Sequence, residues 1–156
     1  MQKIIPALWF NGNAEEAVNF YVSLFPDSRI NKLSHYTKAG PEPEGTVMMI
    51  DFSLSGQDFL AINAGPDFSF SSAISFLVNC EDQAEIDRLW DQLAIGGKPM
   101  VCGWIIDKFG VTWQITPIAL REMMSDKDKV KAERVARAMF PMVKLDLAKL
   151  KQAYEQ

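Results

Sequence analysis

The stretch CGWIIDKFGVTWQITP, residues 102–117, contains the features that decide the fold. Its two arms, Trp104–Ile106 and residues 111–116, are apolar and aromatic, and they flank the turn sequence Asp-Lys-Phe-Gly. Gly110 can adopt the positive φ that a short hairpin loop requires, and Pro117 has no backbone N–H with which to continue a ladder. The stretch therefore predicts a β-hairpin, and the simplest interpretation is a core element of a sheet.

Size and composition indicate one ordinary globular domain. The chain has 156 residues, of which 48% are hydrophobic and 23% charged, and a chain of this length can bury its own core. The net charge of −4 and the scattered basic residues argue against nucleic-acid binding, because phosphates attract clustered positive charge. We find no membrane span and no signal-peptide pattern, so we expect a cytoplasmic protein. Free thiols at Cys80 and Cys102 are then expected, although the sequence leaves a disulfide open.

The first part of the chain predicts a strand, a helix and three further strands. The apolar run 4–10 stops at the turn residues 11–13, and a helical pattern of apolar residues then continues to Pro26. Asn13 and Glu16 have the spacing of a capping box at the start of this helix. Residues 38–45 are rich in proline and glycine and predict a loop. The remaining predicted strands are 28–36, 46–54 and 59–62, the last two joined by residues 55–58.

The same pattern begins again at residue 73. Residues 73–79 are strand-like, and Asp82 with Glu85 repeats the capping spacing. The hairpin 102–117 then closes the second copy. We therefore predict an α+β fold of two paired β-α-β-β-β modules, 1–70 and 71–117, each too small to bury its sheet face alone.

Residues 118–156 belong to neither module and predict a helical extension. Pro117 fits the first turn of one helix with Thr116 as its cap, and Ser125 with Asp128 suggests the start of a second. A third helix is expected over 146–154. Two readings are open: a flap on its own domain, or an arm across a partner subunit. Open sheet edges and an apolar helix face favour a homodimer.

Several stretches together resemble a known family. These are FYVSLFPDS in the first helix, AISFLVNC, DRLWDQL and the hairpin CGWIIDKFGVTWQITP. They resemble the PhnB-like branch of the vicinal oxygen chelate superfamily, which includes glyoxalase I, extradiol dioxygenases and bleomycin-resistance proteins. The resemblance covers about residues 3–117 and implies a glyoxalase-like domain over 1–117 whose curved sheets form a cup. The extension also resembles that of some members.

The resemblance also implies where a metal would bind. Metal-using members hold a divalent ion with His and Glu side chains from the first and last strand of each module. The corresponding residues of this chain are Pro6, Ala61, Ala73 and Gln114. Proline and alanine have no donor atom, and a neutral glutamine is a weak ligand. We therefore expect no metal centre of the glyoxalase type and no other cofactor.

Many relatives carry the label of demethylubiquinone methyltransferase domains, which this sequence does not support. It has no glycine-rich strand-to-helix turn with a downstream acidic residue, and it lacks the alternating βα series of such enzymes. Other chemistry also has weak support. His35 is the sole histidine and is interpreted as a surface residue, and no base can be named for Cys102. The carboxylates of Asp51, Asp58 and Asp107 are expected to solvate strand ends.

The aromatic residues of the strands point to a binding pocket instead. Strand alternation places Gln114 and Trp113 on opposite faces of the sheet. The resemblance implies that Gln114 lies inside the cup, and Trp113 would then pack under a helix. The leading hypothesis is a metal-free, homodimeric protein that binds an unknown small apolar or aromatic molecule. The first alternative is a metal-assisted lyase, isomerase or dioxygenase with ligands placed differently, and the second is an interaction module that acts through its tail. The candidate pocket residues are Trp9, Asn63, Phe76, Trp104 and Gln114.

Overall fold

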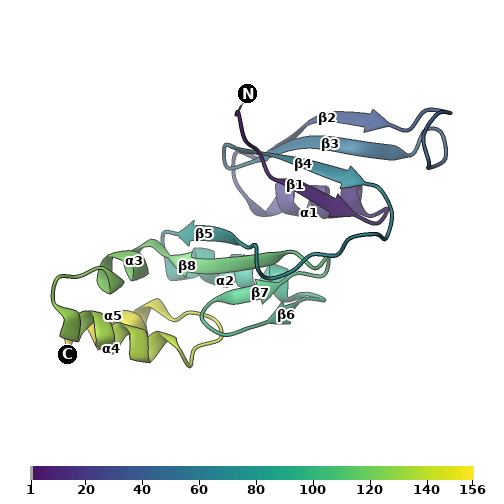
Figure 1. Cartoon of the computed structure of the whole chain (residues 1–156). Coiled ribbons are helices and arrows are strands. Elements are labelled where there is room, and N and C mark those ends of the chain that lie inside the picture. The colour runs from purple at the N-terminus through teal and green to yellow at the C-terminus, as the bar shows by residue number, and fades with distance from the viewer. Residues whose placement is uncertain (1) are drawn as a thin grey trace. The chain divides into compact units, whose positions relative to one another are not determined.

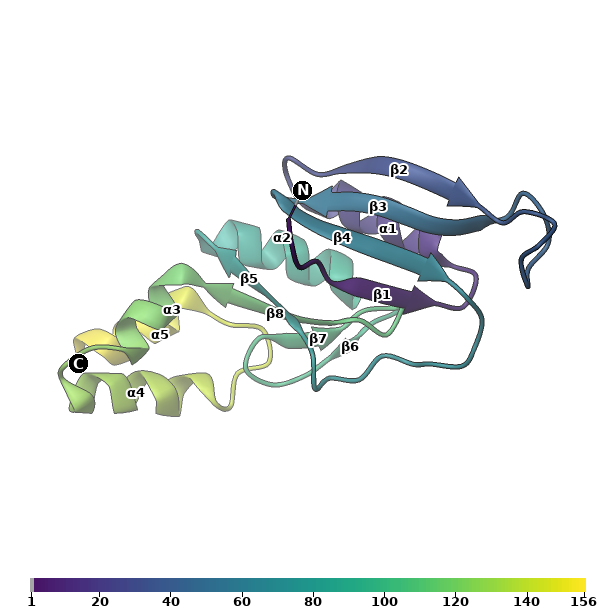
Figure 2. The same ribbon diagram turned by 45° about the horizontal axis from the view of Figure 1, so that its top comes forward.

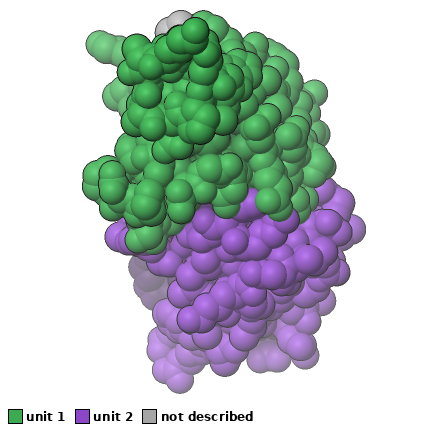
Figure 3. Space-filling model, turned by 90° about the vertical axis from the view of Figure 1, so that its right-hand side faces the viewer, with its two compact units in different colours: residues 1–70 green, residues 71–156 purple. Residues whose placement is uncertain are grey.

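The computed structural model describes residues 2–156 and divides into two compact units, residues 1–70 and 71–156 (Figure 3). Each unit contains one four-stranded sheet, with the strand orders β1-β4-β3-β2 and β5-β8-β7-β6. The first strand of each module pairs in parallel with the last, and the remaining pairs are antiparallel. This arrangement confirms the predicted α+β class and the repeated β-α-β-β-β module (Figure 1).

The first unit is a sheet with one helix along one face (Figures 1 and 2). In the β3–β4 hairpin, Leu54 pairs with Gln57, and the two loop residues Ser55 and Gly56 have φ of 45° and 83°. Two consecutive positive φ angles are typical of a type I′ turn, so the connection is two residues rather than the predicted four. The elements are β1 Ala7–Phe10, α1 Ala14–Leu24, β2 Arg29–His35, β3 Val47–Leu54 and β4 Gln57–Asn63.

Strand alternation gives this sheet a helix face and a far face, the latter pointing away from its own helix. Phe10, Ile50 and Phe52 are almost fully buried on the helix face. Trp9 and Met49 pair in register with Ile62 on neighbouring strands and lie together on the far face. Every second side chain along these strands is therefore apolar and packs in the core against α1.

The predicted capping box at the start of α1 is wrong in one respect. Asn13 occupies the N-cap position but its side chain makes no capping hydrogen bond. Instead, Ala14 N–H donates to Oδ1 of Asn63 at 2.9 Å, so a residue at the end of β4 satisfies the first helical N–H. This cap requires the folded unit, because the two residues are far apart in sequence.

The second unit contains the predicted hairpin. Trp104 pairs with Gln114 and Ile106 with Thr112, so the loop spans residues 107–111. The capping spacing of the second helix also holds, because Glu85 N–H donates to Asp82 Oδ1 at 2.8 Å and Glu85 Oε2 accepts from Glu81 N–H at 2.9 Å. The elements are β5 Phe76–Cys80, α2 Gln83–Ala94, the unpredicted two-residue β6 Lys98–Pro99, β7 Trp104–Ile106 and β8 Thr112–Pro117.

The extension forms α3 Ile118–Met124, α4 Lys129–Met139 and α5 Leu147–Glu155. Its helix starts differ from the predicted caps. Pro117 itself takes the N-cap position of α3, in place of Thr116, and Asp128 rather than Ser125 caps α4 through Val130 N–H and Lys131 N–H. The three helices enclose a small core of Leu120, Met123, Val135, Leu145, Leu147 and Leu150.

This extension is bonded to the second module of its own chain. Cys102 N–H donates to Met142 O at 2.7 Å, and Gly103 N–H donates to Val143 O at 2.9 Å. Gln83 Oε1 accepts from Leu147 N–H at 2.8 Å. The extension is therefore a flap that packs on the second module of its own chain. A role at a partner subunit stays a prediction. Among residues 2–156, no helix is both long and apolar enough to cross a bilayer.

Candidate functional site

Gln114 lies on β8, an inner strand of the second sheet. Its side chain is on the far face of that sheet, which points away from α2. Gln114 pairs in register with Leu77 of β5 and Trp104 of β7, and in-register neighbours project to the same side. Its amide Nε2 donates to Ser75 Oγ at 2.8 Å. This hydrogen bond fixes the amide, and Oε1 has no hydrogen-bond donor among residues 2–156. The far face therefore offers an oriented acceptor between an indole ring and a leucine that is 44% exposed.

Phe76 lies on the opposite face of the same sheet. It pairs in register with Trp113, and the two ring centroids are 5.4 Å apart. Trp113 is 3% exposed, as expected for a residue under α2. The structure therefore brings Trp104 and Gln114 together and places the half-buried Phe76 on the other face of the sheet, against Trp113.

Of the positions expected for metal ligands, Pro6 and Ala73 lie outside the strands of their own units, and Ala61 lies on the helix face of its sheet. Pro6 precedes β1, and its carbonyl accepts from Leu60 N–H at 3.0 Å. Ala61 is fully buried and pairs with Ile50 on the helix face. Ala73 lies in a turn rather than at the start of a strand, because β5 begins at Phe76.

The residues that replace these positions on the far faces do not supply donors for a divalent ion. Leu60 and Ile62 flank Ala61 on the far face, and Ser75 is the residue that contacts Gln114. Within residues 2–156, no three side chains of the His, Cys, Asp or Glu type are grouped so that they could hold a metal. Within each unit the expected positions therefore carry no His, Asp or Glu side chain for a divalent metal, and the absence of a metal centre stays a prediction.

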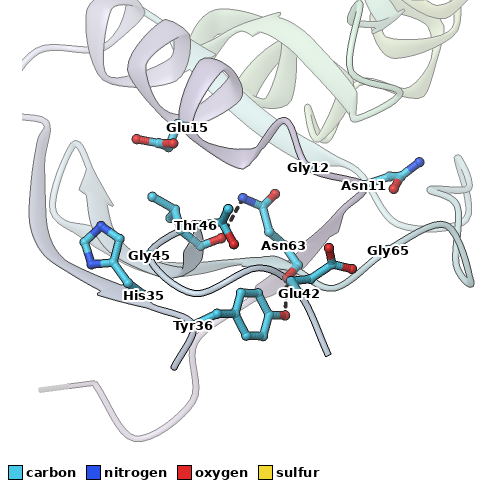
Figure 4. A pocket seen from close by; sticks show the side chains of 11 residues that line it. Asn11, Gly12, Glu15, His35, Tyr36, Glu42, Gly45, Thr46, Asn63 and Gly65 are labelled. Atoms are coloured by element: carbon cyan, nitrogen blue, oxygen red, sulfur yellow. Dashed lines mark hydrogen bonds between the residues drawn. The ribbon is translucent and has the colours of Figure 1, made fainter. Parts of the chain in front are cut away.

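Trp9 and Asn63 belong to the first unit. Trp9 Nε1 donates to Gly65 O at 2.9 Å, and its ring meets Phe68 edge-on with centroids 4.9 Å apart. Asn63 is 8% exposed and holds Ala14 N–H through Oδ1 and Val47 O through Nδ2. Asn63 lines a cavity of about 480 Å³ (Figure 4), and Trp9 is hydrogen-bonded to Gly65, another residue of its lining.

This cavity is polar and acidic. Glu15 from α1, His35 from the end of β2 and Glu42 from the loop between β2 and β3 lie around its rim, with Asn63 between them (Figure 4). No sequence pattern marks Glu15 or Glu42 as a site residue, since acidic side chains in a first helical turn or a loop are usually solvated. The lining is Asn11, Gly12, Glu15, His35, Tyr36, Glu42, Gly45, Thr46, Val47, Asn63 and Gly65.

The two cysteines are free thiols that differ in burial. Cys80 is fully buried, and burial, followed by the charge of Glu85, raises the pKa of its thiol to about 12. Such a thiol stays protonated and is a poor nucleophile. Cys102 is half-buried, with Sγ 3.6 Å from the carbonyl oxygen of Phe140. The disulfide between Cys80 and Cys102 that the sequence left open is not formed.

Comparisons with known proteins agree with this architecture. The family model described as 3-demethylubiquinone-9 3-methyltransferase matches residues 2–116. A search of curated proteins gave no match. A structure from Bacillus cereus, described as a 3-demethylubiquinone-9 3-methyltransferase, PhnB protein, is 42% identical with a TM-score of 0.69, covering 74% of this chain and 99% of that one.

Two further structures are more distant. Protein PA1353 from Pseudomonas aeruginosa is 25% identical, with a TM-score of 0.60 and coverage of 72% of this chain and 95% of that one. The fosfomycin resistance protein FosX from Mesorhizobium loti is 12% identical, with a TM-score of 0.50 over 78% of this chain and 98% of that one, and shares the fold alone. The chain therefore belongs to the PhnB-like 3-demethylubiquinone-9 3-methyltransferase family.

Proposed function

We propose that this protein binds a small molecule on the far face of its second sheet without a divalent metal. The observation that carries the proposal is the Gln114 amide, which stands where metal-using relatives place an acid and which Ser75 holds in one orientation. An amide is a directional hydrogen-bonding group, whereas a metal site at this point needs a charged ligand. The residue is therefore suited to orienting a ligand.

The surroundings of Gln114 support an apolar or aromatic ligand that carries a hydrogen-bond donor. Trp104 and Leu77 lie on either side of it in the sheet and supply apolar surface. Small-molecule sites usually combine such surface with a few placed polar groups. Gln114 Oε1 is the acceptor that would select a hydroxyl or N–H group.

The family description names a methyltransferase, and our proposal does not include methyl transfer. Both sheets consist largely of antiparallel pairs, and each contains a single parallel pair between its first and last strand. The turn between β1 and α1 contains one glycine, Gly12. These features support a binding module rather than a fold with a glycine-rich nucleotide cradle.

A homodimer of this kind in the cytoplasm is part of the proposal. The edge strands of the two sheets, β2 and β1 in the first and β5 and β6 in the second, offer backbone groups for pairing with another chain. Size-exclusion chromatography with light scattering would measure the mass directly.

Titration calorimetry with 2-naphthol, an aromatic probe with one hydroxyl donor, tests the site. We expect Gln114→Ala to weaken binding by about two- to tenfold, since one net hydrogen bond is lost. Gln92→Ala, which removes an exposed amide on α2, is the matched control and should bind normally. Elemental analysis of the same preparation decides the metal question: one transition metal per chain, with binding abolished by a chelator, would refute the proposal.

A further inference from the structure

We propose that the cavity of the first unit is a second binding site, which takes a small organic cation with amine or guanidinium N–H donors. The cavity lies at the end of the sheet where α1 begins and where the loop 37–46 returns to β3 (Figure 4). All of its lining residues belong to residues 1–70. The inference is independent of the proposed site at Gln114, because it uses none of the same side chains.

The floor of the cavity is held in place before any ligand binds. Asn63 uses both ends of its amide, accepting from Ala14 N–H at 2.9 Å and donating to Val47 O at 3.1 Å. Tyr36 is 7% exposed, and its hydroxyl donates to Asn63 O at 2.6 Å. The buried side-chain amide of Asn63 on β4 thus connects α1 and β3. A preformed site loses less conformational entropy when it binds.

The loop that carries Glu42 is closed by hydrogen bonds at its base. Tyr36 N–H donates to Thr46 O and Gly45 N–H donates to Tyr36 O, both at 2.9 Å. Gly40 lies against the Tyr36 ring so closely that an added Cβ would come within 2.5 Å of Cδ1. The loop therefore folds back onto Tyr36, which positions Glu42 at the rim.

The negative charges of the cavity lining favour a cationic ligand. The lining contains two carboxylates, Glu15 and Glu42, and no lysine or arginine. Within residues 2–156, neither carboxylate nor the His35 ring makes an ion pair or a side-chain hydrogen bond. Carboxylates accept strongly from cationic N–H groups, and negative potential repels anions. A bare metal ion does not fit, because no described group of three ligand side chains could hold one.

The size of the cavity favours an organic cation over a simple ion. Its volume of about 480 Å³ is within the range of small-molecule pockets. Gly12 and Gly65 leave the rim open, since a Cβ at either position would meet no atom within 4 Å. A ligand of several carbon atoms with cationic groups can therefore enter and reach both glutamates.

Agmatine, which carries an amine and a guanidinium, is the probe. Titration calorimetry with the full chain at about 20 mM salt avoids screening of exposed charges. We expect agmatine to bind and suberate, a dianion of similar length, not to bind. Glu42→Gln and Glu15→Gln should each weaken agmatine binding by about two- to fivefold, as expected for one exposed ion pair. Gln114→Ala should leave it unchanged.

Glu44→Gln is the matched control, because Glu44 lies in the same loop but does not line the cavity. It should change agmatine affinity less than Glu42→Gln does. Circular dichroism verifies that each variant is folded. Absence of agmatine binding, equal binding of suberate, or an equal loss in Glu44→Gln would each overturn the proposal, the last by showing that only diffuse surface charge is involved.

Discussion

Trp113 and Asp107 are joined by a hydrogen bond of 2.8 Å between the indole Nε1 and the carboxylate Oδ2. The other oxygen, Oδ1, accepts from Phe109 N–H at 2.8 Å and from Val111 N–H at 3.0 Å. One carboxylate, 4% exposed, therefore shapes the turn of the hairpin and fixes the tryptophan that backs Gln114. The expectation that Asp107 only solvates a strand end is therefore wrong.

Replacing Asp107 by alanine should strongly destabilise the protein. The change leaves one indole and two backbone N–H groups without their acceptor in a buried place, at a cost of about 2–4 kcal/mol in the free energy of unfolding. Urea denaturation measures this. Asp67→Ala is the control, since Asp67 is exposed, and an equally small effect of both variants would contradict the role of Asp107.

Two asparagines near α1 should differ sharply in their effect on stability. Asn63→Ala removes the bonds to Ala14 N–H and Val47 O, and should lower the free energy of unfolding by about 2–3 kcal/mol. Asn13→Ala should cost less than about 0.5 kcal/mol, since that side chain makes no capping bond. Thermal and urea unfolding of both variants compare them directly; the reverse order would mean that Asn13 caps the helix in solution.

The two thiols should react at very different rates with a disulfide reagent. At pH 8 we expect Cys102 to react in the native protein and Cys80 to react only after denaturation, because Cys80 is fully buried with its pKa raised to about 12. Cys80→Ser and Cys102→Ser identify the reacting residue. Two rapidly reacting thiols per native chain would contradict the burial of Cys80.

The same shift predicts how stability depends on alkaline pH. The thiol ionises at 9.0 when exposed and at about 12 when folded, so the folded state retains the proton over this interval. The contribution of Cys80 to stability is therefore complete below pH 9 and is lost as pH rises toward 12. Urea denaturation between pH 8 and about 10.5 should show a smaller decline for Cys80→Ala than for the parent.

Gln83 should hold the start of α5 against the second module. Its amide accepts from Leu147 N–H at 2.8 Å and donates to Leu145 O at 3.1 Å. Gln83→Ala should speed amide hydrogen exchange in the first turn of α5 and lower stability by about 1–2 kcal/mol. Gln92→Ala controls for loss of an amide on the same helix. Unchanged exchange in Gln83→Ala would show that the tail is held elsewhere.

The sequence predicts local features of this fold well and the pairing of distant ones poorly. The hairpin at Asp107 and the cap at Asp82 depend on residues within a few positions, and both are found. Asn13 has the same capping pattern as Asp82, but α1 is capped by Asn63, 49 residues away. The spacing of capping residues in the sequence does not reveal that a helical N–H, here that of Ala14, is satisfied by a residue of a neighbouring strand.

The candidate site shows the same limit. A two-residue loop at Ser55 and Gly56 sets the register of β4, which places Ala61 on the helix face and Leu60 on the far face. A shift of one residue reverses the faces of a strand, so the expected ligand position could not be fixed from the sequence. Glu42 lies in a loop without periodicity, and its place at a cavity follows from the fold of the whole first unit.

The bonds from residues 102 and 103 to residues 142 and 143 run between main-chain atoms. No substitution other than proline, which lacks the N–H, removes such a donor. The side chain of Val143 is 46% exposed, so that position can change without disturbing the attachment. Related chains can therefore keep the flap docked while its sequence diverges, and sequence similarity in the tail is a poor guide to whether a relative retains it.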